Sequence, residues 1–313
     1  MSTLFGKQLN VAGTNANTFL FGTGTTGGNT QLVVNSGVFF GFDFVTHFLS
    51  LHQGAELKMQ GGGAIASFGI NVSQMSLISG FGTVLLTSTG TKFDMAGTVR
   101  PVGGDLTLAS FAADRLDLDG NVGGVEPGRL DVTANGNLSI LGSLADAYNG
   151  VINIGNSNSV EFDTALNMEG ELNFTSSTGN QLIAPSIIFS TGAEVTVDGA
   201  IGEIDASTIW TGNTQISLVN PTDELHFAAD SNFAFSTVFS GSGLLVNDNG
   251  ATMTLQHGAD VSTRLLNHGT LDVGSSSAGF ALLEEYHQSG GGRIKIEIGG
   301  PLPGIDFDQI SIT

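Results

Sequence analysis

The chain lacks cysteine, and among its 313 residues it has one tryptophan, two tyrosines and nine lysine and arginine residues. Without cysteine, disulfides, thiolate metal sites and a cysteine nucleophile are excluded. The nine basic residues face 29 acidic ones, which gives a formal net charge of −20. A chain so poor in positive charge has no electrostatic footprint for nucleic acid, so we expect no nucleic-acid partner.

Long apolar runs are also missing. No stretch approaches the roughly 18 apolar residues of a membrane-spanning helix, so we expect no membrane insertion. The first residues, Met1 to Lys7, lack the charged and apolar regions of a signal peptide, so no export signal is visible in this chain.

Glycine is abundant, with 46 residues, and short apolar-x-apolar pairs recur along the sequence about every 21 residues. The first series of pairs is Val84/Leu86, Leu106/Leu108, Leu130/Val132, Ile152/Ile154, Leu172/Phe174, Val195/Val197, Ile216/Leu218, Phe233/Phe235, Met253/Leu255, Leu271/Val273 and Ile294/Ile296. A second series follows it by about 8 to 10 residues and includes Phe93/Met95, Leu116/Leu118 and Leu138/Ile140. Alternation with a period of two predicts strands, and Gly-Gly and Asn-Gly pairs between them predict turns.

This pattern predicts an all-β fold, a right-handed parallel β-helix with about 21 residues per coil and roughly a dozen coils. The 21 phenylalanines suit the interior of a narrow coil, because a phenyl ring needs no hydrogen-bond partner there. We expect residues 1–37, rich in Gly, Thr and Asn, to form a cap or a flexible segment. We expect residues 38–313 to form one solenoid domain that continues beyond residue 313 or stacks there on another subunit.

Residues 266–313 resemble a pattern of large, repetitive, secreted bacterial proteins of the autotransporter-passenger-like and haemagglutinin-like β-helix type. The matching residues begin with Leu266-Asn267-His268-Gly269-Thr270-Leu271-Asp272-Val273 and continue through residues 286–300 to Pro303-Gly304-Ile305-Asp306-Phe307 and beyond. The resemblance implies an extracellular or cell-surface location. It carries no catalytic residue, and the membrane barrel of an autotransporter is not part of this chain.

The outward positions of the second series are often acidic. They are Asp94, Asp117, Asp119, Glu161, Asp163 and Asp205. If the coils stack in register, these residues form an acidic stripe in which like charges repel one another. Calcium would relieve that repulsion through oxygen ligands, and Asp94, Asp117 and Asp119 are the candidate ligands. The alternative is a solvated acidic face that keeps the protein soluble and binds no cofactor.

Signs of catalysis are weak. The six histidines show no His-x-His or His-Glu-x-x-His spacing, so a zinc site lacks support and isolated histidines are expected. Arg293-Ile294-Lys295 looks like the short basic motif of polygalacturonases, but Gly-His-Gly and a paired Asp-Asp strand motif are missing. A polyanionic substrate would also be repelled by a chain this acidic.

We therefore expect a non-enzymatic extracellular structural protein, a fibre, filament or surface-layer subunit, that self-associates end to end through its solenoid ends. One alternative is a secreted adhesin or carbohydrate-binding β-helix that contacts a glycan or cell surface. It predicts exposed aromatic residues, and Trp210, Tyr148 and Tyr286 are the only tryptophan and tyrosines available. A second alternative is a polysaccharide hydrolase or lyase with convergent acidic, histidine and basic residues.

Overall fold

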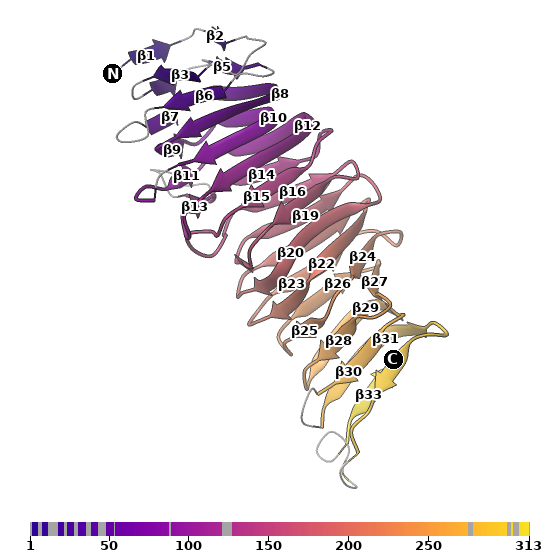
Figure 1. Ribbon diagram of the computed structural model, residues 1–313. Helices are drawn as coiled ribbons and strands as arrows, with labels where there is room; N and C mark the ends of the chain where they lie inside the picture. The colour runs from indigo at the N-terminus through magenta and orange to yellow at the C-terminus, as the bar shows by residue number, and fades with distance from the viewer. Residues whose placement is uncertain are drawn as a thin grey trace. The chain divides into compact units, whose positions relative to one another are not determined.

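The chain is an all-β parallel β-solenoid of about 11 turns that lie about 22 residues apart, and the described residues contain no helix (Figure 1). This computed structural model describes residues 2–5, 8–11, 18–21, 24–27, 31–35, 39–42, 48–52, 54–87, 89–120, 127–274, 278–298, 302 and 307–312. The predicted parallel β-solenoid is confirmed, with a repeat close to the expected 21 residues.

The chain divides into two compact units. The first unit comprises residues 1–153 and 158–164, and the second comprises residues 154–157 and 165–313. One strand, β16 (Val151–Gly155), has residues of both.

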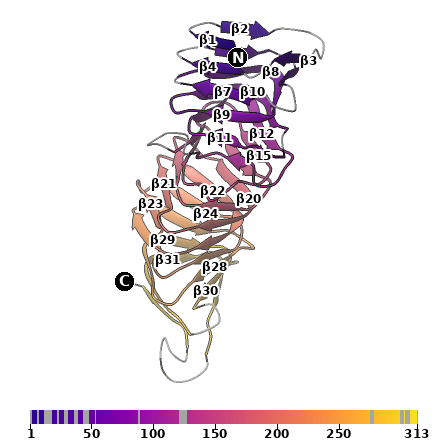
Figure 2. The same ribbon diagram turned by 90° about the vertical axis from the view of Figure 1, so that its left-hand side faces the viewer.

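Three faces of stacked parallel strands make up the first unit (Figure 2). Face one contains β1 (Ser2–Phe5), β4 (Gly24–Gly27), β7 (Phe48–His52), β9 (Gly69–Val72), β11 (Phe93–Met95) and β13 (Leu116–Asp117). Face two contains β2 (Gln8–Val11), β5 (Gln31–Val34), the first parts of β8 (Glu56–Ser67), β10 (Leu77–Leu86) and β12 (Thr98–Ser110), and β14 (Arg129–Val132). Face three contains β3 (Thr18–Phe21), β6 (Phe39–Phe42), the last parts of β8, β10 and β12, and then β15 (Leu138–Leu141) and β17 (Ser159–Phe162).

The described parts of residues 1–37 include β1 to β5, which pair in parallel as the later strands do. The boundary between residues 37 and 38 stays a prediction.

Glycine turns the chain from face two to face three. In β10 the register shifts between Gly80 and Gly82, and Gly80 has a φ of 96°. A Cβ on Gly80 would lie 1.7 Å from the carbonyl oxygen of Met59 on the preceding coil. Only glycine combines this left-handed backbone with so close an approach between coils. The bend therefore lies inside a continuous strand.

The core of the first unit is a set of aliphatic ladders. Val84 lies between Ile65 and Leu108, and Leu108 pairs in turn with Ile140, all of them fully buried. Stacking like residues at the ~4.8 Å strand spacing removes these side chains from water on every side.

One step of the predicted series is wrong. The 21-residue spacing places Leu130 after Leu106, but Leu106 pairs with Leu138, and Leu130 pairs with Val99 on face two. The register partners Leu106 and Leu138 are 138 − 106 = 32 residues apart, so a constant period of about 21 residues passes here from one face to another.

The second unit also has three faces. Face one contains β19 (Glu171–Thr175), β21 (Glu194–Asp198), β23 (Gln215–Leu218) and β26 (Val238–Gly241). Face two contains the first parts of β20 (Asn180–Phe189) and β22 (Ile201–Trp210), β24 (Glu224–Phe227), β27 (Leu244–Asn247), and the last parts of β29 (Ala259–Asn267) and β31 (Phe280–Gln288). Face three contains β18 (Leu166–Met168), the last parts of β20 and β22, β25 (Ser231–Phe233), β28 (Thr252–Leu255), β30 (Thr270–Val273) and β32 (Arg293–Lys295). The last strand, β33 (Gln309–Ile312), pairs with the first part of β31.

The core of the second unit contains an aromatic stack. The Trp210 ring lies 3.9 Å from that of Phe189 and 5.2 Å from that of Phe233, centroid to centroid. Trp210 is 1% exposed, and its Nε1 donates a hydrogen bond to Thr208 Oγ1 at 3.0 Å. The indole N–H thus finds the partner that burial requires.

The series is also wrong at Phe233/Phe235. Ile216 pairs with Phe239, and Phe233 belongs to the Trp210 ladder. Phe235 follows the strand and is 67% exposed.

Candidate functional site

The acidic positions at the end of face one in the first unit lie close together. Asp94 of β11 is the register partner of Asp117 of β13, as the sequence predicted for stacked coils. Asp119 follows two residues later, where the strand has ended. An isolated parallel bridge between Leu116 and Leu144 brings the segment that carries Asp146 alongside.

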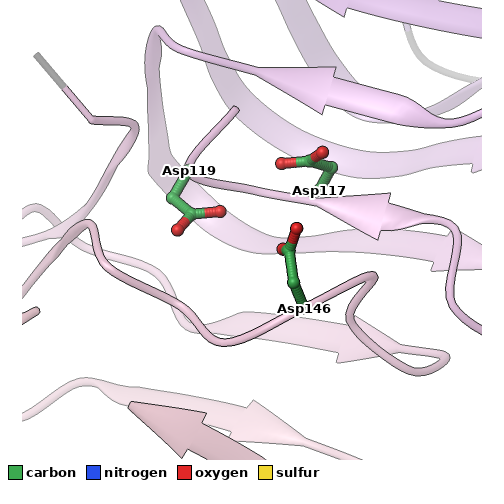
Figure 3. Close-up of side chains that lie close together, drawn as sticks. All are labelled: Asp117, Asp119 and Asp146. Carbon is green, nitrogen blue, oxygen red and sulfur yellow. The ribbon is translucent and has the colours of Figure 1, made fainter. Parts of the chain in front are cut away.

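Asp117, Asp119 and Asp146 form a triad whose nearest carboxylate oxygens all lie within 4.8 Å of one another (Figure 3). Figure 3 shows the three side chains directed into one space, Asp146 from the opposite segment. We call this group the acidic triad. The structure thus brings two of the three predicted residues together, places Asp94 beside them, and adds Asp146.

Asp146 escaped the sequence analysis because it belongs to no strand and follows the lengthened coil. Its signal was the apolar Leu144, which continues the ladder of Leu116.

Asp119 is the most buried member of the triad, at 9% exposure. Its Oδ2 accepts a hydrogen bond from the backbone N–H of Asn149 at 2.6 Å. Burial raises the pKa of Asp119 from 3.8 to about 6; the charges of Asp117 and Asp146 add to this shift and the Asn149 N–H opposes it. The folded chain therefore disfavours a full set of negative charges here.

Lys92 supplies the positive charge nearest to Asp117. Its Nζ lies 2.9 Å from Asp117 Oδ2. The hydrogen bond from Lys92 to this carboxylate raises the lysine pKa, although burial opposes the rise. One ammonium group on an exposed side chain neutralises only part of the cluster.

Asp94 lies beside the triad but is not a member of it. Its Oδ1 is buried without a hydrogen-bond partner among the described residues, and burial raises its pKa, with the charge of Asp117 adding to the effect. A Cβ on Gly120 would lie 1.9 Å from this oxygen, so only glycine leaves room for it.

Carboxylate oxygens at this separation suit a hard divalent cation, because calcium takes oxygen ligands at about 2.3–2.6 Å and tolerates irregular geometry. Without a cation, the same arrangement is an acidic patch with one partly protonated carboxyl. These are the two interpretations that the sequence left open.

The predicted stripe does not extend as expected. Glu161 pairs with Ser139 on face three of the first unit, so Glu161 and Asp163 continue a different ladder from Asp94 and Asp117. Asp205 belongs to β22 of the second unit. Only two carboxylates stack directly in this ladder among the described residues, because the next positions are Asn71 before Asp94 and, by the bridge of Leu116 to Leu144, Ala145 after Asp117.

His226 lies between two carboxylates. His226 Nδ1 lies 3.1 Å from Asp248 Oδ1, and His226 Nε2 lies 3.0 Å from Glu224 Oε2. Asp248 is contributed by the next coil, as the pairing of β24 with β27 requires. These partners are carboxylates and not other histidines, and stacking joins Asp248 to His226 across coils.

A scan against protein-family models, a search of curated proteins and a search of solved structures each find no match to this chain. Within the described residues, no helix is long and apolar enough to span a membrane. The candidate site therefore stands on its own geometry.

Proposed function

We propose that the chain is a non-enzymatic extracellular structural protein, a subunit of a fibre, filament or surface layer, that self-associates through its solenoid ends. The solenoid fold supports self-association. Each coil pairs with the next through parallel strands, so a coil at the end presents the same kind of strand edge that the inner coils use. The extracellular location rests on the resemblance of residues 266–313 to secreted β-helical proteins.

The observation that carries the proposal is the uncovered apolar surface of the last strands. Ile294 of β32 continues the ladder of the fully buried Leu271, yet it is 39% exposed. Ile312 of β33 continues the ladder of Leu283, which is 1% exposed, yet Ile312 is 58% exposed. A second copy whose strands continued the parallel register would bury both side chains and pair the free strand edge.

The alternative functions receive less support. Trp210 and Tyr148 are each 1% exposed, so neither ring is available to stack on a sugar in an adhesin. For a polysaccharide-degrading enzyme, acidic, histidine and basic side chains should converge. Among the described residues, the acidic triad has Lys92 beside it and contains no histidine.

The decisive experiment compares Ile312→Asp with Ile209→Asp. Ile209 is similarly exposed, at 48%, but lies on a lateral strand face of β22. We expect wild-type protein to form filaments with rising concentration, seen by electron microscopy and sedimentation velocity. Ile312→Asp should abolish them and Ile209→Asp should leave them intact. A wild-type chain that stays monomeric throughout, or equal effects of both substitutions, contradicts the proposal.

The acidic triad supports a second candidate function, the binding of calcium, which would stabilise this coil. The specific observation is Asp146, which supplies the third carboxylate of the triad in place of the predicted Asp94. We expect millimolar calcium to raise the melting temperature of wild-type protein and not that of Asp146→Asn. If calcium changes neither the melting temperature nor assembly, the triad is a solvated acidic face.

A further inference from the structure

A groove on the outside of the first unit lies where β8, β10 and β12 bend. It encloses about 510 Å³, within the range of roughly 300–1,000 Å³ that is usual for small-ligand sites. Residues from all three strands line it, and Gly61 and Gly80 are among them.

The accessible lining is largely apolar. Leu77, Phe81 and Val102 contribute side chains, and Val102 is 44% exposed. Gly104 packs closely against the Phe81 ring: a Cβ on Gly104 would lie 3.0 Å from it. A rigid aromatic and aliphatic wall of this kind favours a ligand with an apolar body.

The polar part of the groove carries available positive charge. Lys58, Ser79 and Arg100 occupy one register position on three successive coils, which sets Lys58 and Arg100 about 10 Å apart at the backbone. Lys58 makes no ion pair or hydrogen bond with any residue that the structure describes. Elsewhere in the described chain, Lys92 and Lys295 are both paired with carboxylates.

Glu56, which lines the groove, and Asp131 beside it already accept hydrogen bonds. Glu56 accepts hydrogen bonds from Gln31 and Ser79, one on each carboxylate oxygen. Asp131 Oδ2 accepts from Arg100 Nε at 2.9 Å and Nη2 at 2.7 Å, and Asp131 Oδ1 accepts from Thr133. Arg100 is thereby held in place with its Nη1 left for another acceptor. Among the charged side chains that line the groove, Lys58 and Arg100 are the ones that keep free hydrogen-bond donors.

We propose that this groove binds a small organic monocarboxylate with an apolar body, its carboxylate at Lys58 and Arg100 and its body against Phe81 and Val102. A single charge is required because the net charge of −20 repels polyanions. At physiological salt the Debye length is about 8 Å, so distant carboxylates affect one bound charge little. This inference does not depend on the assembly proposal.

The test titrates the full chain into 4-fluorobenzoate and measures binding of this probe by fluorine NMR. We expect it to bind at least about tenfold more tightly than 4-fluorobenzamide, which has the same shape without the charge. Lys58→Gln should weaken binding of the benzoate by about tenfold and leave that of the amide unchanged. Lys295→Gln removes the same charge from the second unit and should have no effect.

A second pair of variants guards against effects on folding. Val102→Asp places a negative charge at the groove and should abolish binding of the benzoate. Val219→Asp, at a comparably exposed valine of the second unit, should not. Absence of saturable benzoate binding, equal affinity for benzoate and benzamide, or insensitivity to both Lys58→Gln and Val102→Asp overturns the proposal.

Discussion

The two units share one coil architecture but differ in the side chains that fill their cores and in how their carboxylates are paired. The Val84 ladder of the first unit is aliphatic, whereas the Trp210 ladder of the second stacks aromatic rings at 3.9 and 5.2 Å. The first unit brings three carboxylates within 4.8 Å of one another, whereas Asp272 in the second has Lys295 at 2.9 Å. Register stacking therefore amplifies whatever residue the sequence repeats: like apolar groups stabilise a ladder, and like charges strain it.

The largest effect should come from breaking the aromatic ladder. Trp210→Ala removes a fully buried ring and should lower the free energy of unfolding of the second unit by about 4 kcal/mol, through lost burial and the cavity left behind. The measurement is urea denaturation, with hydrogen exchange to locate the loss in β20, β22 and β25. Phe235→Ala, at an exposed ring in the same unit, should change stability by less than about 0.5 kcal/mol. Equal losses would contradict the assignment of the ladder.

Replacing glycine at a bend should cost more stability in the first unit than in the second. Gly80→Ala in the first unit combines an unfavourable φ with a clash against Met59 and should cost about 3 kcal/mol. Gly199→Ala in the second unit has a φ of 65° but no atom within 4 Å of the new Cβ, so about 1 kcal/mol is expected. Denaturant midpoints of the two variants measure the difference. A cost for Gly80→Ala no larger than that for Gly199→Ala would show that the coils can separate at this bend.

The smallest effect concerns the strained charges of the first unit. The pKa of Asp119 is raised from 3.8 to about 6, so the folded chain binds this proton more tightly than the unfolded chain. The resulting stabilisation is fully present below the unfolded pKa and is lost as pH rises through about 6. Asp119→Asn should remove this loss and be more stable than wild type above pH 6 by about 1 kcal/mol, allowing for solvent screening.

Urea midpoints across pH 4 to 7 test this expectation for both proteins. Asp260→Asn, at an exposed carboxyl of the second unit, should keep the wild-type pH dependence. A pH profile unchanged by Asp119→Asn would show that this carboxyl ionises as freely as in the unfolded chain.

Much of the fold followed from local pattern. Alternating apolar residues and glycine-rich turns were enough to predict parallel coils, because only inward positions of stacked strands need to be apolar. The pattern failed where coil length changed: it joined Leu106 to Leu130 and Ile216 to Phe233, since a period has no information about which face a strand occupies. The same limit hid Asp146 and divided the predicted acidic stripe.

The sequence by itself determined the kind of structure and its chemical character: strands, a repeat near 22 residues, no thiol chemistry and a net charge of −20. These are properties of composition and of short spacings, which act locally. Only the tertiary structure decided which side chains meet. The acidic triad, the carboxylates around His226 and the Lys58 groove each join residues from different coils, and their contacts depend on the register between coils and on the bends at positive-φ glycines.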